Sequence, residues 1–306
     1  MPIKIPNDLP AVKTLEAENI FVMSETRAMT QDIRPLKILL LNLMPTKIDT
    51  ETQFSRLLGN SPLQVELTLL HTKTHKAKNI SEEHLLNFYR CFEEIENEKF
   101  DGMIVTGAPV EKLEFSEVGY WDELRRILDW GLTHVHSTIF VCWGAQAGLK
   151  HFYGINKYPL DDKVFGIFPH IVEDRMSPLF RGFDDEFMAP HSRHTEIRRD
   201  DLLDCPGIKI LASSPEAGIY AAEAMGGRQV FITGHPEYDA DTLAKEYFRD
   251  KNLGLPIAPP KNYYPNDDDT LPPVVSWRAH ANLLYSNWLN YYVYQRTPFD
   301  INNFNK

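Results

Sequence analysis

Cysteine is scarce in this sequence of 306 residues. The three cysteines, Cys91, Cys142 and Cys205, lie far apart and form no Cys-x-x-Cys pair. An odd number of widely spaced cysteines argues against a disulfide framework and against a cysteine-bound zinc site. This cysteine usage is typical of a reducing compartment, so we predict a cytoplasmic protein.

Long apolar runs and an excess of positive charge are also absent. No uncharged apolar run approaches the roughly 20 residues of a membrane span, and residues 1–8 lack the apolar core of a signal peptide. The net charge of −11 gives no support to nucleic-acid binding, although a small basic pocket for a phosphorylated ligand remains compatible with it. We therefore expect neither a membrane nor a nucleic acid as a partner. No P-loop or Gly-x-Gly-x-x-Gly fingerprint for a dinucleotide is present.

Short apolar runs that end in turn or loop signals are present instead, and they are typical of strands covered on both faces of a sheet. Helical patterns alternate with these runs, which predicts parallel pairing in a layered α/β fold. The predicted strands are residues 36–43, 63–70, 102–106, 137–141 and 229–233.

Three helices are predicted between or after these strands, each from apolar residues three and four apart. In the first, Ser81 caps a stripe of Leu85, Phe88, Tyr89 and Phe92. The second carries Trp121, Leu124 and Leu128, and the third carries Ala240, Leu243, Ala244, Tyr247 and Phe248 with Asp239 or Asp241 as its cap.

We predict one α/β domain with an extension at each end. Residues 1–34 form an N-terminal arm, residues 35–253 the core, and residues 254–306 a proline-rich connector and a C-terminal helix. Residues 254–273 contain six prolines. The helix that follows is predicted to pack on the core through Trp277, Leu284, Trp288 and Tyr292.

Cys142 stands where a predicted strand stops. A cysteine at such a position is by default a small buried hydrophobe, and that is our interpretation of Cys91 and Cys205. After Cys142, however, small residues permit a tight turn into a helix. This strand–turn–helix elbow would expose a nucleophile at a helix N-terminus, where the dipole favours thiolate. It would also aim the Trp143 backbone N–H at an oxyanion.

His235 and Glu237 follow another predicted strand. Pro236 disfavours helical geometry at His235, and in an extended segment residues two apart face the same side. Glu237 can therefore support the imidazole, although a purely structural contact is the alternative. Strand ends of an open α/β sheet share one edge, so Cys142 and His235 are expected to meet there as nucleophile and base.

The segments around these residues resemble those of the homoserine O-acyltransferase family of methionine biosynthesis, which is related to class I glutamine amidotransferases. The match covers Val-Cys-Trp-Gly-Ala-Gln-Ala at 141–147 and Thr-Gly-His-Pro-Glu-Tyr-Asp at 233–239. It continues in residues 35–45, 106–109, 189–193 and 286–294. The resemblance implies a flavodoxin-like, amidotransferase-type core with a mostly parallel sheet and a Cys142–His235–Glu237 triad.

The same resemblance implies ping-pong acyl transfer from an acyl-CoA to the hydroxyl of L-homoserine through an acyl-enzyme at Cys142. Our candidate oxyanion donors are the Trp143 amide and an amide of the Gly107–Ala108 turn. Lys163, Ser192 and Arg249 match homoserine-contacting positions of the family. Taken alone, these three would be a solvated charge, a loop hydroxyl and a helix-end cation.

Glu111 matches the position at which family members that use acetyl-CoA have glutamate and those that use succinyl-CoA have glycine. A carboxylate there would repel the terminal carboxylate of a succinyl group. We therefore predict acetyl transfer, with acetyl-CoA as a co-substrate, no bound cofactor, and a homodimer by resemblance. An exposed loop glutamate is the alternative interpretation of Glu111.

Other functions remain as alternatives. The nearest is succinyl transfer by the same triad, followed by glutamine amidotransfer or hydrolysis, although Phe140 replaces the first glycine of the usual Gly-x-Cys-x-Gly elbow. A non-enzymatic binding protein with an inert cysteine is the third. The pairs His71/His75 and His191/His194 have spacings that can bind metal on a helix, but neither has a nearby acidic or cysteine ligand cluster, so we predict no metal site.

Overall fold

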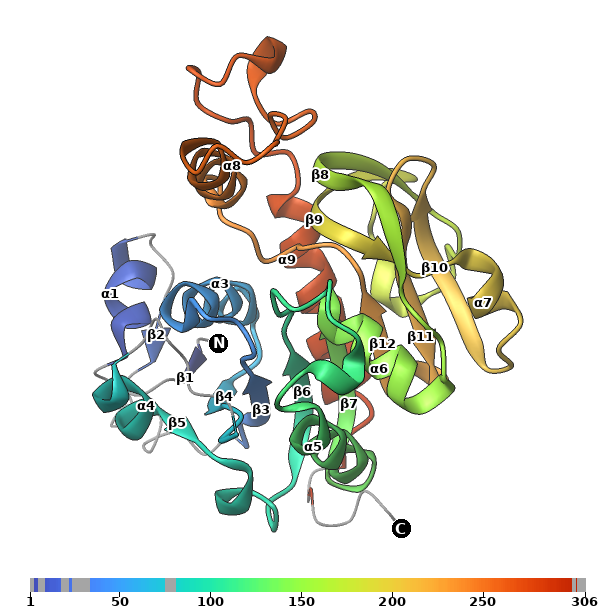
Figure 1. Ribbon diagram of the computed structural model, residues 1–306. Helices are drawn as coiled ribbons and strands as arrows, with labels where there is room; N and C mark the ends of the chain where they lie inside the picture. Colours follow the sequence, from blue (N-terminus) through green and yellow to red (C-terminus); the bar gives the residue numbers. More distant parts are fainter. Residues whose placement is uncertain are drawn as a thin grey trace.

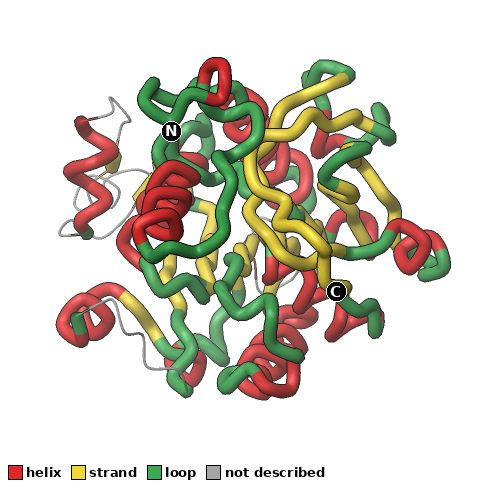
Figure 2. The backbone as a smooth tube through the Cα atoms, turned by 45° about the horizontal axis from the view of Figure 1, so that its top comes forward, coloured by secondary structure: helices red, strands yellow, loops and turns green. Residues whose placement is uncertain are grey.

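One continuous sheet organises the computed structural model, which describes residues 3–4, 9–17, 22–23, 34–74, 81–298 and 301. The strand order is β2-β1-β4-β3-β6-β7-β12-β11-β10-β8-β9, with β5 paired to β4. Helices lie on both sides of the strands (Figure 2). This arrangement is the layered α/β fold that the alternating sequence pattern predicts.

The parallel half of the sheet holds all five predicted strands. Their apolar side chains are buried because helices cover both faces. The observed bounds differ from the predicted ones by no more than two residues. The strands are β3 (Leu36–Leu41), β4 (Val65–Leu70), β6 (Phe100–Val105), β7 (Val135–Val141) and β12 (Gln229–Ile232), and β1 (Ile3–Lys4), β2 (Val22–Met23) and β5 (Tyr89–Arg90) extend the same side.

Four antiparallel strands continue the sheet beyond β12, and the sequence interpretation named none of them. The longest pair, β8 and β9, forms a hairpin that rises above the sheet edge in Figure 1. The four strands are β8 (Tyr158–Val172), β9 (Glu186–Glu196), β10 (Ile208–Ser214) and β11 (Gly218–Ala224).

Two apolar clusters form the core, one on each face of the sheet. Helices α5 (Trp121–His134) and α6 (Trp143–Tyr153) enclose one cluster. Helices α3 (Lys47–Gly59) and α9 (Arg278–Asn287) enclose the other, together with the π-helix η6 (Trp288–Tyr294). Figure 1 shows α5 and α6 in front of β6 and β7, with α9 behind them.

The remaining helices are short or peripheral. They are α1 (Pro10–Ala17), α4 (Glu82–Phe88), α7 (Arg199–Leu203), α8 (Thr242–Asn252), and the 3-10 turns η1 (Phe92–Glu94), η2 (Phe115–Glu117), η3 (Pro178–Phe180), η4 (Met225–Gly227) and η5 (Pro265–Asp267). No helix within the described ranges has the length and apolar character needed to cross a membrane.

Two of the three predicted helices need correction. Ser81 does cap α4, accepting a hydrogen bond from the His84 amide, but Tyr89 and Phe92 lie outside the helix, in β5 and η1. Both are buried because the chain returns to the sheet edge after Phe88. In the third helix, Ala240 precedes α8 and Phe248 is 38% exposed, so the predicted apolar stripe was too wide there.

The C-terminal helix packs on the sheet as predicted. Leu284, Trp288 and Tyr292 are all buried. The Trp288 indole donates to Ser137 Oγ on β7 at 3.0 Å. It also explains Gly102 in β6, because a Cβ there would lie 2.8 Å from the Trp288 ring. A glycine in the sheet therefore makes room for the tryptophan.

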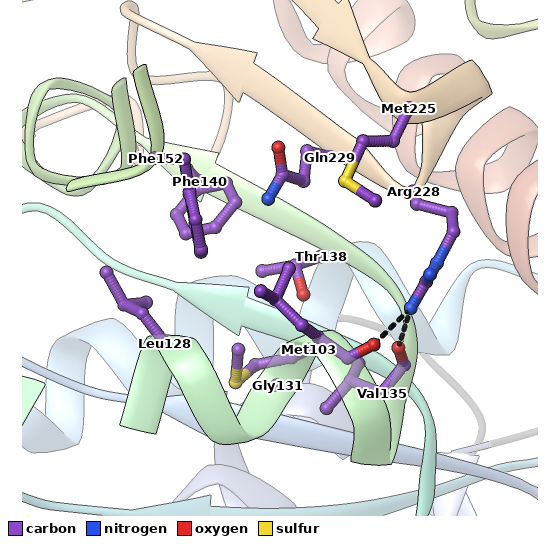
Figure 3. Close-up of a pocket in the computed structure, with 11 residues that line it drawn as sticks. Met103, Leu128, Gly131, Val135, Thr138, Phe140, Phe152, Met225, Arg228 and Gln229 are labelled. Atoms are coloured by element: carbon purple, nitrogen blue, oxygen red, sulfur yellow. Dashed lines mark hydrogen bonds between the residues drawn. The ribbon is translucent and has the colours of Figure 1, made fainter. Parts of the chain in front are cut away.

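A small closed space under α5 is not a ligand site. Figure 3 shows Leu128, Phe140 and Phe152 around it, with Arg228 reaching toward Val135. The Arg228 guanidinium donates to the carbonyl oxygens of Leu132 and Val135. The cavity has a volume of ≈ 10 Å³, which is room for one water molecule at most.

Candidate active site

Cys142 occupies a strained turn between β7 and α6. Its φ of 51° and ψ of −116° are unusual for a residue with a side chain, and such strain persists only where the surroundings impose it. The Cys142 amide donates to Ile232 O of β12 at 2.7 Å, which ties the turn to the neighbouring strand. The side chain is 8% exposed at the N-terminus of α6. This is the predicted elbow.

Two glycines allow other backbone to approach this elbow closely. A Cβ at Gly144 would lie 2.6 Å from Thr106 O and 2.7 Å from Val105 O, so α6 can start against the end of β6 only with glycine there. A Cβ at Gly107 would lie 3.3 Å from Cys142 Cβ and 3.6 Å from His235 Cε1. The Gly107–Ala108 turn therefore borders the cysteine and the histidine.

The predicted oxyanion donors surround the Cys142 side chain. Trp143 begins α6, and the first amides of a helix have no partner within that helix. Gly107 lies across the turn, with its hypothetical Cβ 3.8 Å from Cys142 Sγ, and Ala108 follows it in the chain. The structure thus places Gly107 near the sulfur, with Trp143 next to Cys142 in the chain, and the role of these residues as donors stays a prediction.

His235 joins Cys142 to Glu237. Its Nδ1 lies 2.7 Å from Glu237 Oε1, and a second hydrogen bond connects the ring to Cys142. All three side chains are buried. Burial alone would lower the pKa of His235, but the negative charges of Cys142 and Glu237 and the two hydrogen bonds raise it well above its ordinary value. The arrangement favours the protonated form of the imidazole.

The His235 ring is fixed from several directions. Tyr238 stacks on it with ring centroids 4.1 Å apart and planes 13° apart. The His235 amide donates to Pro190 O at 2.9 Å, and the Trp277 indole donates to Tyr238 O at 3.0 Å. His235 is thus held directly by Pro190 of β9 and, through Tyr238, by Trp277 at the start of α9. Both residues lie far from His235 in sequence.

Lys163 and Ser192 converge on a carboxylate that the sequence interpretation did not name. Lys163 Nζ lies 2.5 Å from Glu246 Oε1, and Ser192 Oγ donates to the Glu246 oxygens at 2.9 and 2.8 Å. The strand register explains this meeting: Phe165 of β8 pairs with Ser192 of β9, and Lys163 shares a face with Phe165. Glu246 reaches them from α8.

Arg249 lies one turn further along α8, at the rim of this cluster. Its Nη2 is 3.9 Å from Glu246 Oε1, while its Nε donates to Asp250 at 2.7 Å. The side chain is 61% exposed. The three predicted homoserine contacts therefore share one partner, with Lys163 and Ser192 bonded to it and Arg249 near it.

Glu111 is held in place on the other side of the site. Its Oε2 accepts from the His194 amide at 2.9 Å and from Thr195 Oγ1 at 3.3 Å. Thr195 is bonded in turn to Gln146 of α6, one turn beyond Cys142. Glu111 is thus a fixed carboxylate rather than the loose loop side chain of the alternative interpretation.

Tyr238 lies near all of these groups. Burial raises its pKa well above the ordinary value, and the negative charges of Glu246, Glu237, Cys142 and Glu111 raise it further. The Tyr238 ring therefore lies within the electrostatic reach of the triad, of Glu246 and of Glu111. Sequence periodicity could not show this convergence, because the residues come from four separate segments.

Other sequence expectations have simpler outcomes. Cys91 and Cys205 are only partly buried, so their interpretation as buried hydrophobes was wrong. His191 is buried and its Nε2 lies 3.0 Å from His170 Nε2, while His194 is three positions along the same strand and so on its opposite face. His75 lies outside the described residues. Within the described part of the chain, no group of three or more metal-ligating side chains occurs.

The fold and this geometry define the class: an amidotransferase-like α/β protein with a Cys–His–Glu arrangement at the ends of its parallel strands. Solved structures share the fold. A glutamine amidotransferase from Thermotoga maritima has a TM-score of 0.52 over 84% of this chain and 98% of that chain, at 12% identity. One from Methylobacillus flagellatus has a TM-score of 0.52 over 84% and 95%, at 13% identity.

Sequence relatives narrow the class to one family. Residues 2–299 match the family described as homoserine O-succinyltransferase, and the chain belongs to this family of acyltransferases. It is 63% identical to a homoserine O-acetyltransferase of Acetivibrio thermocellus, over 99% of both chains. It is also 61% identical to one of Brevibacillus brevis, over 99% of both, and 62% identical to one of Clostridium acetobutylicum, over 98% of this chain and all of that one.

Proposed function

We propose that this protein transfers the acetyl group of acetyl-CoA to the hydroxyl of L-homoserine through a thioester on Cys142. The observation that carries the proposal is the buried chain from Cys142 through His235 to Glu237, in which the imidazole pKa is raised by both partners. Such a pair supplies a nucleophile and a proton carrier without any bound cofactor. The site fits a reaction in which acetyl-CoA enters as a co-substrate.

In the first half-reaction the Cys142 thiolate attacks the thioester carbon. The new bond joins Sγ to the acetyl carbon, and the bond from that carbon to the CoA sulfur breaks. Nδ1 of His235 is engaged by Glu237, so the other ring nitrogen gives its proton to the departing sulfur. The negative charge that develops on the carbonyl oxygen is placed near the amides of Trp143 and Gly107.

In the second half-reaction neutral His235 takes the proton of the homoserine hydroxyl as its oxygen attacks the acetyl carbon. The carbon–sulfur bond to Cys142 breaks, so the thiolate and the imidazolium are restored. Glu237 keeps the ring in the tautomer that presents a free nitrogen to the hydroxyl. General-base assistance of this kind is worth about 10²–10⁴-fold in rate.

The Glu246 cluster offers complementary charges to an amino acid. Its carboxylate suits the α-ammonium group of homoserine, and the cations of Lys163 and Arg249 suit the α-carboxylate. Ser192 Oγ, now bonded to Glu246, adds a hydroxyl that fixes the orientation. The three residues that resemble homoserine contacts thus gain a fourth member in Glu246.

Glu111 supports acetyl as the acyl group. Its carboxylate is fixed by two hydrogen bonds, so it cannot swing away from an incoming succinyl carboxylate without losing them. Burying two like charges side by side costs several kcal/mol. Homoserine O-succinyl transfer by the same triad is the second candidate, because it needs only a different acyl group in the space beside Glu111.

We also propose that the protein is cytoplasmic, on the basis of its cysteine usage, and that it is a homodimer, on the basis of the family resemblance.

The decisive experiment is intact-mass analysis after mixing the protein with acetyl-CoA alone. We expect one acetyl adduct with release of one CoA, and loss of the adduct when homoserine is added. Cys142→Ala should give no adduct, whereas Cys91→Ala is the matched control and should behave as the native protein does. No adduct and no CoA release would refute the proposal, and glutaminase activity in its place would favour amidotransferase chemistry.

A further inference from the structure

A large cavity opens beside Glu111 and lies between the β8–β9 hairpin and the connector after α8. We refer to it as the β8 cavity. Its lining includes Lys112, Lys163, Phe165, His194, Ile257 and Lys261. Its volume is ≈ 790 Å³, which is in the range of pockets for ligands much larger than homoserine.

We propose that the β8 cavity binds the pantetheine arm and the phosphates of the acyl-CoA. This inference rests on the proposed function and adds to it the location of the donor's non-reacting part. A CoA thioester is a long ligand with an apolar, amide-bearing arm at one end and several phosphates at the other. A cavity for it needs an apolar wall, cations, and an opening onto the acyl site.

Two of the residues that line the cavity adjoin the acyl site. Lys112 lines the cavity and is the next residue after Glu111, which we assign to the acyl group. His194 also lines the cavity, and its own backbone N–H donates to Glu111 Oε2 at 2.9 Å. The β8 cavity therefore lies next to the residues that adjoin and hold Glu111, and we assign the rest of the thioester to it.

The walls of the cavity include apolar side chains, and backbone hydrogen bonds hold the two walls together. Phe165 and Phe168 of β8 line the cavity together with Ile257 and its proline neighbours in the connector. The connector is fixed to the strand because Lys261 N donates to Phe165 O at 3.0 Å and Ile167 N donates to Lys261 O at 2.8 Å.

Gly166 makes this docking possible. It has a φ of 141°, and a Cβ there would lie 2.4 Å from the Lys261 backbone. Only glycine accepts both the conformation and the approach. The connector thus closes one side of the cavity as an ordered wall, and Figure 1 shows it leaving α8 beside the β8–β9 hairpin.

The cations at the rim suit phosphate groups. Lys112 is exposed, and Lys261 pairs with Glu216 in a contact whose side chains are 54% and 43% exposed. Water screens such a pair, so it contributes little and can be exchanged for a phosphate. Two further carboxylates line the cavity, Asp162 and Asp250, and Asp250 is bonded to Arg249. The lysines can therefore turn to a bound anion.

A second cavity of similar volume, ≈ 760 Å³, lies between α3 and α9 and suits this ligand less well. Four carboxylates and three cations line it, and two of the cations, Arg56 and Lys245, are paired with Asp239 and Asp241. It reaches Glu237, which lies behind the imidazole relative to Cys142. A polyanion would meet net negative charge there.

The test compares two acetyl donors on Lys112→Ala, Lys261→Ala and the double variant. One donor is acetyl-CoA, and the other is S-acetyl-N-acetylcysteamine, which has the thioester but no phosphates. We expect KM for acetyl-CoA to rise about threefold to fivefold for each lysine, and further in the double variant, because water screens the ion pairs of exposed side chains. The rate of Cys142 acetylation by the truncated thioester should stay unchanged. Lys245→Ala, in the second cavity, is the matched control.

Equal effects on both donors, or no effect on either, would overturn the inference, and so would a raised KM for acetyl-CoA in Lys245→Ala alone. These results differ from a failure of the proposed function. In that case the native protein would form no acetyl-enzyme from either thioester, and the inference would fall with it.

Discussion

Glu111 is the single residue on which the choice of acyl donor depends. Glu111→Gly removes a carboxylate that the His194 amide and Thr195 hold in place, and with it both volume and charge. We expect kcat/KM for succinyl-CoA to rise at least about tenfold relative to acetyl-CoA, because several kcal/mol of like-charge repulsion disappears. Steady-state kinetics with both donors measures this ratio. Glu117→Gly, in the same loop, is the control, and an unchanged ratio in Glu111→Gly would contradict the assignment.

Among single residues, the sequence predicted best the contacts of those whose partners are close in the chain. His235 and Glu237 meet because an extended segment places residues two apart on one side, and the structure shows their 2.7 Å contact. Glu246 was missed because its importance depends on where α8 docks. As a helical glutamate it has no local signal, and only the β8–β9 register brings Lys163 and Ser192 to it.

The start of α6 is the element that presents the nucleophile. In Gly144→Ala the new Cβ would lie 2.6 Å from Thr106 O, and backbone cannot yield as a flexible side chain does. We expect α6 to shift and Cys142 acetylation to slow by about 10²-fold, since misplacement of about 1 Å has effects of this size. Stopped-flow measurement of CoA release would show it. Gly119→Ala, whose Cβ meets nothing within 4 Å, should leave the rate unchanged, and a normal rate in Gly144→Ala would refute this account of the elbow.

The elements that could be predicted are those buried on both faces. The strands β3, β6 and β7 each end in at least three consecutive buried apolar residues, and helices cover both sides of them. The β8–β9 hairpin could not be recognised in the same way. The first half of β8 is largely exposed and contains Pro159, Asp161 and Asp162, which are residues typical of loops. Its pairing comes from β9 rather than from its own pattern.

A buried pair of histidines makes the folding stability of the whole protein depend on pH. His170 and His191 are both 0% exposed and are joined through their Nε2 atoms at 3.0 Å. Burial lowers the pKa of His170 to about 3. Burial, and then the positive charges of His170, Arg193 and His235, lower the pKa of His191 well below its ordinary value. The folded protein therefore keeps the pair neutral, while the unfolded chain protonates both histidines below about pH 6.5.

This difference in proton binding fixes the sign of the effect. The stabilisation is fully present above the unfolded pKa and is lost as the pH falls below it, because the unfolded state then binds more protons. At pH 5 each histidine lowers the free energy of unfolding by roughly 2 kcal/mol. Urea unfolding at pH 7.5 and at pH 5 should show this loss, before most carboxylates titrate. His170→Phe keeps an aromatic ring beside Phe187, and its loss of unfolding free energy between the two pH values should be smaller by the contribution of one histidine. In the control His134→Gln, on α5, the loss should equal that of the native protein. A loss in His170→Phe equal to that of the native protein would show that His170 is protonated in the folded protein or opens to water.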